Sequence, residues 1–167
     1  MAAGMSLEEV NVEILEECLN RDAGLTEDDL TPKLYLDAVL PFADISEGLM
    51  EELALLEPYG NGNPKPVFAS SGVKVRGMRR IGKDGSSLRL QVTDNRGTSI
   101  TGLYFQDADG FEDYLTEEFG SDTVKELYRG RAEVSLTLAF APSMDDYQGR
   151  QYSQIIVEKY KKFVATR

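Results

Sequence analysis

The side chains best suited to chemistry in this sequence are cations at short spacing. Six of them fall between residues 74 and 89, namely Lys74, Arg76, Arg79, Arg80, Lys83 and Arg89. Two adjacent rings, Tyr104 and Phe105, come later. Cations that neutralise phosphates and rings on which bases stack are the two ingredients of sequence-tolerant binding to a nucleic-acid strand. The pattern therefore predicts a surface that contacts a polyanion.

The same residues also permit a plain structural interpretation. Alternate residues of a strand share a face, so Lys74, Arg76 and Arg80 are expected on one face while Val73 and Val75 point to the core. An ordinary solvated strand face would carry the same cations. Adjacent strand residues point to opposite faces, so at most one of Tyr104 and Phe105 can offer its ring to a base.

Two loops are further candidates for contact with phosphates. Glycine-rich turns can present backbone N–H groups to an anion, or the segment can be a rigid turn between domains, which we favour; its residues are Tyr59, Gly60, Asn61, Gly62 and Asn63. Near the C-terminus, Tyr147, Gln148 and Arg150 are predicted in a hairpin loop, where the neighbouring Asp145 and Asp146 would repel phosphate.

The charge is distributed unevenly along the chain. The net charge of the 167 residues is −11, yet residues 1–60 hold 15 acidic against 2 basic residues, and residues 61–167 hold 14 against 16. Residues 64–105 hold 8 basic against 2 acidic residues. Local field decides where a phosphate backbone can lie, so the acidic average does not exclude a polyanionic partner.

Several classes of site and location are disfavoured by composition. The chain has no histidine and one cysteine, Cys18, so an internal disulfide is excluded and a zinc site or histidine-based catalysis is not expected. It has no apolar run of about 18 residues and no secretory leader, so we expect a soluble cytoplasmic protein without a membrane partner.

Helical periodicity dominates the first part of the chain. A capping box at Ser6 starts a helix with apolar residues at helical spacing, which ends near Asn20. An acidic linker over residues 25–33 and a short strand over 34–39 follow. Ser46 is the predicted N-cap of a second helix, which must end by Pro58.

Beyond the Pro- and Gly-rich segment the apolar period changes to two, which is typical of strands. The sequence predicts five strands: over 67–81 with a bend at Gly72 or Gly77, around 88–92, over 98–105, over 132–140 and over 152–160. A helix is expected over 111–119. Five strands with a helix between the third and fourth is the order of an OB-fold, a barrel that commonly binds oligonucleotides. We therefore predict an α+β chain in which a helical and short-strand connector precedes an OB-fold.

One stretch resembles a known family. The residues Leu56-Glu57-Pro58-Tyr59-Gly60-Asn61-Gly62-Asn63-Pro64-Lys65-Pro66-Val67-Phe68 resemble the junction that introduces the OB-fold of RecJ-type single-stranded-DNA exonucleases. Residues 2–7 resemble the segment after the Gly-Gly-His of their DHHA1 domain, and residues 147–151 resemble their last hairpin.

The resemblance implies a domain order and a role. It implies the tail end of a DHHA1-type domain over 1–24, a helical connector over 25–57 and an OB-fold domain over 58–167. The catalytic DHH domain, with its Mg or Mn, is absent from this chain, so no catalytic residue, metal or cofactor is expected here. The implied role is to hold single-stranded DNA for a 5′–3′ exonuclease of DNA repair and recombination.

A second role stays open at this point. The acidic first part and the barrel could form a protein-interaction module that docks the missing DHH and DHHA1 domains, or single-stranded-DNA-binding protein, with little DNA contact of its own. Salt dependence separates the two roles, because each neutralised phosphate releases counterions.

Overall fold

Alternating apolar residues form five long strands in the computed structural model, which describes residues 36–147 and 150–164. On the second of these strands, Leu88, Leu90 and Val92 are buried while Arg89 and Gln91 are exposed, as expected where one face of a strand covers a core. The strands are β2 (Phe68–Ile81), β3 (Ser87–Thr93), β4 (Ser99–Tyr104), β5 (Val134–Tyr147) and β6 (Arg150–Lys162).

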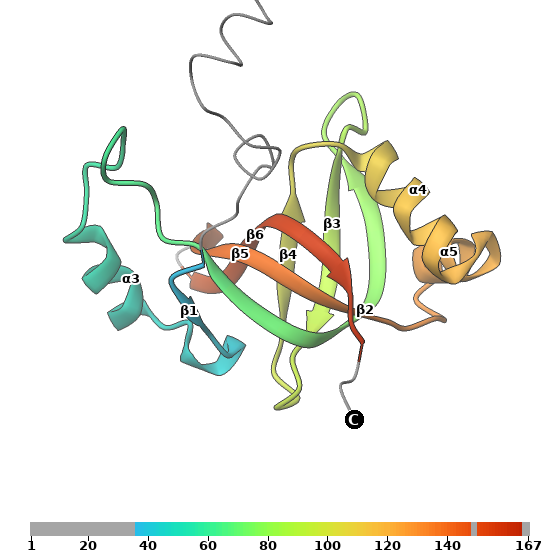
Figure 1. Cartoon of the computed structure of the whole chain (residues 1–167), viewed down its shortest axis with the longest axis horizontal. Helices are drawn as coiled ribbons and strands as arrows, with labels where there is room; N and C mark the ends of the chain where they lie inside the picture. The colour runs from blue at the N-terminus through green and yellow to red at the C-terminus, as the bar shows by residue number, and fades with distance from the viewer. Residues whose placement is uncertain (1–35, 148–149, 165–167) are drawn as a thin grey trace, which may run out of the picture. The chain divides into compact units, whose positions relative to one another are not determined.

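These strands close into a barrel (Figure 1). Their order is β2-β3-β4-β6-β5, and β5 returns to pair with β2. The β4–β6 pair is parallel, and the other pairs are antiparallel. A closed five-stranded mixed barrel with its helices between the third and fourth barrel strands is an OB-fold, so the predicted fold class is confirmed.

The first bend in β2 lies at Gly72. The register between β2 and β5 shifts between Ser70 and Val73, and Gly72 has a φ of 68°. A side chain is strained in this left-handed region, whereas glycine enters it freely. The ring of Phe163 lies 3.7 Å from the place a Cβ would take at Gly72, so the bend also allows the C-terminal segment to lie close to β2.

The second irregularity in β2 is a bulge at Arg76. The register between β2 and β3 shifts between Val75 and Gly77, which leaves Arg76 as the extra residue. An extra residue reverses the inward and outward alternation beyond it. Val75 and Met78 are accordingly buried, whereas Arg76 and Arg79 are exposed.

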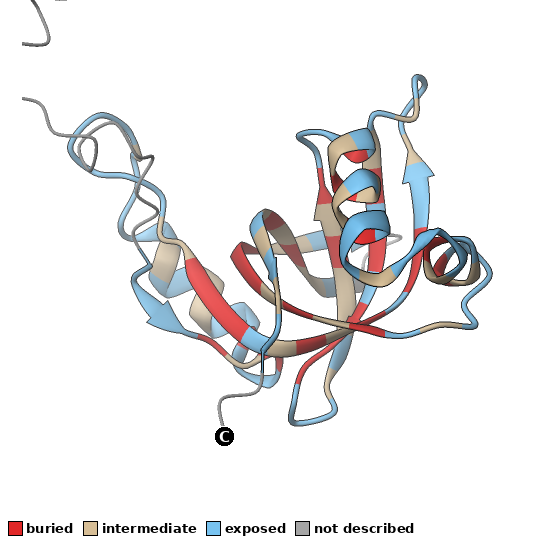
Figure 2. Cartoon of the chain, turned by 45° about the vertical axis from the view of Figure 1, so that its right-hand side comes forward, coloured by how far each residue is buried: buried red, intermediate tan, exposed pale blue. Residues whose placement is uncertain are grey.

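Two helices connect β4 to β5 and cover one side of the barrel, where α4 turns its buried residues to the strands (Figure 2). They are α4 (Ala108–Phe119) and α5 (Ser121–Tyr128). Asp107 caps α4 by accepting a hydrogen bond from the backbone N–H of Gly110 at 3.0 Å. The helix predicted over 111–119 is confirmed, whereas α5 was not predicted, because only Val124 and Leu127 of its residues are buried.

The segment before the barrel contains three short elements. They are β1 (Ala38–Val39), the 3-10 helix η1 (Phe42–Asp44) and α3 (Glu47–Ala54). The predicted cap of α3 is confirmed, because the Ser46 side chain accepts a hydrogen bond from the backbone N–H of Leu49 at 3.2 Å. The short predicted strand is also present as β1, which pairs in parallel with the start of β2.

Residues 36–45 pack against the barrel rather than apart from it. The buried Phe42 ring lies 5.7 Å from the ring of Phe140, centroid to centroid. The Asp94 carboxylate, buried at the β3–β4 turn, accepts a hydrogen bond from the Phe42 backbone N–H at 2.9 Å. The Ser153 hydroxyl donates to the Ile45 carbonyl at 2.8 Å. This segment is thus part of the barrel's core.

The turn at residues 59–63 is closed by its own backbone. Gly60 and Asn63 exchange backbone hydrogen bonds of 2.8 and 3.1 Å, and the Asn63 side chain donates to the carbonyls of Leu56 and Pro58. The Tyr59 hydroxyl donates to the Leu53 carbonyl at 2.7 Å. The N–H groups of Gly60 and Asn63 are therefore already used, which favours the interpretation as a rigid turn.

Some predictions fall outside the described residues. These are the helix over residues 6–20, the acidic linker over 25–33, the first part of the strand predicted over 34–39, the domain predicted over 1–24 and Gln148.

Candidate nucleic-acid interface

Two arginines face each other across neighbouring strands. In the β2–β3 ladder Arg79 lies directly opposite Arg89, and both side chains are exposed. The Arg89 guanidinium lies 3.4 Å from the Thr101 hydroxyl, and across residues 36–147 and 150–164 neither arginine forms an ion pair with a carboxylate. Like charges directly opposite on a sheet are destabilising. This pair is therefore a place where a bound anion would relieve repulsion.

The two arginines lie in a groove on the outer face of β3 and β4, which we call the β3–β4 groove. It consists of two hollows of about 780 and 500 Å³. Arg89, Gln91 and Thr101 line both hollows, which therefore adjoin one another at these three residues. The larger hollow adds Arg76, Asp145, Tyr152, Ser153 and Gln154, and the smaller adds Gly77, Arg79, Tyr128, Arg129 and Gly130.

Gly77 lines the smaller hollow next to the side chain of Gln91. A Cβ there would lie 3.1 Å from the Gln91 side-chain oxygen and 3.8 Å from the Leu127 carbonyl oxygen. Because position 77 has no side chain, the Gln91 side chain can lie across the bulge. The lack of a side chain at this position therefore lets Gln91 lie close to the backbone of β2.

Two of the predicted cations are held by a single carboxylate. Lys74 Nζ and Arg76 Nε each lie 2.8 Å from an oxygen of Glu133. These hydrogen bonds, from Lys74 first and Arg76 second, keep the pKa of Glu133 below its usual range. Of the two cations, only Arg76 lines the groove.

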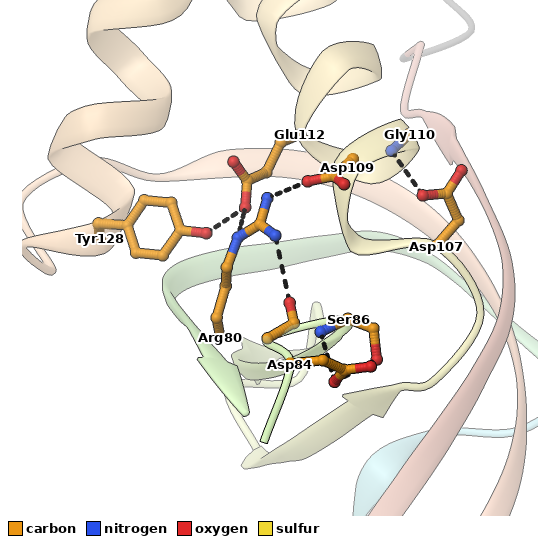
Figure 3. Close-up of polar contacts among 9 residues, drawn as sticks. Arg80, Asp84, Ser86, Asp107, Asp109, Gly110, Glu112 and Tyr128 are labelled. Carbon is orange, nitrogen blue, oxygen red and sulfur yellow. Dashed lines mark hydrogen bonds and ion pairs between the residues drawn. The ribbon is translucent and has the colours of Figure 1, made fainter. Parts of the chain in front are cut away.

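Arg80 is held by two carboxylates (Figure 3), and it lines neither hollow. Its Nε donates to Glu112 at 2.8 Å, and its Nη2 to Asp109 at 2.5 Å. These bonds raise the pKa of the Arg80 guanidinium above its usual range, with Glu112 as the largest cause. The expectation that Arg80 shares a face with Lys74 and Arg76 is wrong, because the bulge at Arg76 breaks the alternation.

The remaining basic candidates are Lys83 and Arg150. Lys83 is exposed in the β2–β3 turn, and its side chain forms no ion pair in the part of the chain that the structure describes. Arg150 opens β6 opposite Tyr147, and the side chain of Arg150 lies outside the described part.

The rings available to a base differ from those expected. Tyr104 is only 5% exposed and packs against Phe111 and Tyr160, with ring centroids 5.4 and 5.6 Å away, so its placement at the surface is corrected. Phe105 is 52% exposed but lines neither hollow. The exposed rings of the groove are Tyr128 and Tyr152, at 39% and 48%.

Sequence reasoning missed the neutral residues of the groove. Gln91 could have been found, because it alternates with the buried Leu90 and Val92 on a predicted strand. Thr101 and Gln154 meet only because β4 pairs in parallel with β6, and Tyr128 belongs to a helix that was not predicted. No local sequence pattern predicts the contacts of Thr101, Gln154 and Tyr128.

The described residues lack the patterns of a metal-binding cluster and of a membrane-spanning helix. No group of three or more histidine, cysteine, aspartate or glutamate side chains there is arranged to hold a metal ion. No helix in this part of the chain is long and apolar enough to cross a membrane.

Known proteins resemble this chain in sequence over the same region. The family model for the RecJ OB domain matches residues 36–159. The single-stranded-DNA-specific exonuclease RecJ of Bacillus subtilis (strain 168) is 33% identical over 94 residues, which are 55% of this chain and 12% of that protein. The RecJ exonuclease of Thermus thermophilus is 34% identical over 82 residues, 49% of this chain and 12% of that protein.

A solved structure resembles this chain in fold. The crystal structure of RecJ from Thermus thermophilus in complex with Mg²⁺ gives a TM-score of 0.57 at 22% sequence identity. The match covers 92% of this chain and 20% of that one. In the two sequence matches, this chain spans about an eighth, 12%, of the length of the curated relatives.

Proposed function

The chain belongs to the RecJ OB domain family, and from that membership and the β3–β4 groove we propose that it holds single-stranded DNA for a RecJ-like exonuclease. Arg79 and Arg89 contact phosphates in this proposal, and Arg76 and Lys83 extend the positive track. The relatives that match are named as single-stranded-DNA-specific exonucleases, which supports the choice of ligand.

The observation that carries the proposal is the pair of facing arginines in the floor of the groove. A phosphate between Arg79 and Arg89 would replace their mutual repulsion by two charge-assisted hydrogen bonds. Beside this pair, the groove offers the side-chain amides of Gln91 and Gln154 and the ring of Tyr152. Cations along a track beside rings suit a strand whose bases are unpaired.

The proposed activity of the full-length protein is based on the family and not on residues of this chain. We propose a metal-dependent 5′–3′ exonuclease of DNA repair and recombination, in which a DHH domain would use Mg or Mn to cut the strand. The present chain would bind and orient the single-stranded DNA and would contribute no catalytic residue.

The salt dependence of binding tests this function. For the full chain with fluorescein-labelled oligothymidylate, replacing both Arg79 and Arg89 by alanine should weaken binding about tenfold or more. The slope of log affinity against log salt should fall by about 1.4, because a single strand releases about 0.7 counterion per neutralised phosphate. Fluorescence anisotropy at several salt concentrations measures both quantities.

A matched control has the same change of charge elsewhere on the barrel. Lys159 and Lys161 are exposed on β6, line neither hollow, and form no ion pair among residues 36–147 and 150–164. Replacing both by alanine should leave the slope nearly unchanged. Equal losses in the two double variants would show that only the total charge matters, and the groove would then not be the site.

A second role is supported by a different surface. Val39 on β1 and Leu55 just after α3 are 78% and 84% exposed, and Leu36 and Leu56 are half exposed. Exposed apolar side chains are typical of contacts with another protein. These side chains could help to dock the DHH and DHHA1 domains or single-stranded-DNA-binding protein. Replacing Val39 and Leu55 by serine should then abolish such docking and leave DNA binding intact.

A further inference from the structure

We propose that Tyr128 is the platform on which a DNA base stacks at the α5 end of the β3–β4 groove, and that Glu112 and Arg80 are positioning residues that hold its ring there. This inference rests on the proposed function and assigns the base contact within it. It also gives Arg80 a role other than contact with phosphate.

The position of Tyr128 suits a platform. It is the last residue of α5, it is 39% exposed, and it lines the same hollow as Arg79 and Arg89. The preceding residue, Leu127, is fully buried, so the backbone that carries the ring is anchored in the core. If the sugar-phosphate backbone lies over the two arginines, a base attached to it can contact this ring, which lines the same hollow.

The hydroxyl of Tyr128 is tied to the barrel through two side chains (Figure 3). It donates to the Glu112 carboxylate oxygen that also accepts from Arg80 Nε. Arg80 Nη1 in turn donates to the Gly85 carbonyl at 3.2 Å. The chain of contacts thus links α5, α4, the end of β2 and the β2–β3 turn, and it fixes the end of the ring that lies away from its backbone.

The charges around Arg80 argue against a phosphate there. One guanidinium faces two carboxylates, those of Asp109 and Glu112. The cluster therefore carries a net negative charge, which repels a phosphate. Burial and the hydrogen bond to Glu112 raise the pKa of Tyr128 to about 12. The hydroxyl is therefore protonated at neutral pH and remains a donor to Glu112.

A ring that is already fixed binds at a lower entropic cost. Ordering a free side chain opposes association, and a tethered tyrosine has already lost that freedom. Stacking on an aromatic side chain is worth about 5- to 140-fold in affinity per base. Removing the ring should cost most of that factor, and removing only the tether should cost a smaller part of it.

Two probes separate base contacts from phosphate contacts. The first is an oligothymidylate of about 12 nucleotides, within the range that one OB-fold covers, and the second is an abasic strand of the same length. Both present the same phosphates, so the ratio of their affinities for the full chain reports the bases alone. The wild-type chain should bind the thymidylate strand more tightly.

The variants follow the proposed contacts. Tyr128→Ala should lower the ratio by up to the full stacking factor of about 5- to 140-fold and leave the salt slope unchanged. Tyr128→Phe and Glu112→Ala should each lower it about 2- to 5-fold, and the double variant should lower it no further than either single one, because both remove the same tether. Phe105→Ala removes an exposed ring that lines neither hollow, and should leave the ratio unchanged.

Each outcome has one meaning. A Tyr128→Ala chain that folds, binds both probes and keeps the wild-type ratio overturns the platform. Independent, additive effects of Tyr128→Phe and Glu112→Ala overturn the positioning role. If wild-type chain binds neither probe, the proposed function fails and this inference fails with it. A lowered salt slope in the Arg79 and Arg89 double variant together with an unchanged ratio in Tyr128→Ala refutes the platform alone.

Discussion

Glu133 controls how much of the positive charge on β2 is available to a ligand. Its carboxylate lies between Lys74 and Arg76, at 2.8 Å from each, and so takes a position that a phosphate could take. Both pairs are partly exposed, and exposed pairs contribute only about 0–1 kcal/mol to stability. This carboxylate therefore matters more for binding than for folding.

Replacing Glu133 by glutamine should strengthen binding of single-stranded DNA about 2- to 10-fold. The salt slope should rise by about 0.7 to 1.4, because one or two cations are released to phosphates. The free energy of unfolding should change by less than about 1 kcal/mol. Anisotropy titrations and urea denaturation measure these quantities.

Asp122→Asn is the matched control for this prediction. It also removes one exposed carboxylate, which pairs with Lys125 at 3.0 Å on α5 and lies outside the groove lining. A similar gain in affinity for both variants would mean that overall charge, and not the release of Lys74 and Arg76, causes the effect.

For single residues, the sequence predicted that cations form the binding surface, but it did not predict which of them are paired with carboxylates. Six cations were expected to act together, and the structure shows Lys74, Arg76 and Arg80 paired with carboxylates while Arg79 and Arg89 face the groove. Pairing depends on Glu112 and Glu133, which are more than 30 residues away in the sequence. A local pattern cannot contain that information.

The elements that position the groove depend on the segment before the barrel. β1 pairs with β2, and η1 brings Phe42 into the core beside Phe140. The Asp94 carboxylate joins η1 to the β3–β4 turn by accepting from the Phe42 backbone N–H, and it also accepts from the N–H groups of Arg96 and Thr98. The ends of β3 and β4 are thereby held by residues that precede the Pro- and Gly-rich turn.

Replacing Phe42 by alanine should therefore destabilise the barrel. The expected loss in the free energy of unfolding is about 3–5 kcal/mol, the usual cost of removing a buried phenylalanine. Urea denaturation followed by circular dichroism measures it. Val39→Ala is the control, because Val39 is 78% exposed and should cost less than about 0.5 kcal/mol. A loss under about 1 kcal/mol for Phe42→Ala would contradict the role given to this segment.

Elements with strong periodicity were predicted well. The five barrel strands and the cap at Ser46 are confirmed, and the first strand, for which one bend was predicted at Gly72 or Gly77, has an irregularity at both places. α5 was missed because it buries only Val124 and Leu127 among polar residues. The contact of Phe42 with the barrel was missed because it joins residues 98 positions apart. Tertiary packing, and not local preference, decides both.

Over the whole molecule the distribution of charge matters more than its sum. The chain carries −11, yet the excess of acidic residues lies within residues 1–60. The groove combines arginines with neutral amides and exposed rings, and among the described residues that line it only Asp145 is acidic. Exposed charges farther apart than about 8–10 Å are screened at physiological salt. Binding should therefore follow the local field of the groove.

The measurement that tests the proposed groove most directly is a nuclear magnetic resonance titration of the ¹⁵N-labelled full chain with oligothymidylate. We expect the largest amide shift changes on β2 and β3 around Arg79 and Arg89, on β4 around Thr101, and at the end of α5. They should shrink as salt is raised. Changes centred on Lys159 and Lys161 of β6, or on the exposed residues of β1 and α3 with the groove unaffected, would contradict DNA binding in this groove.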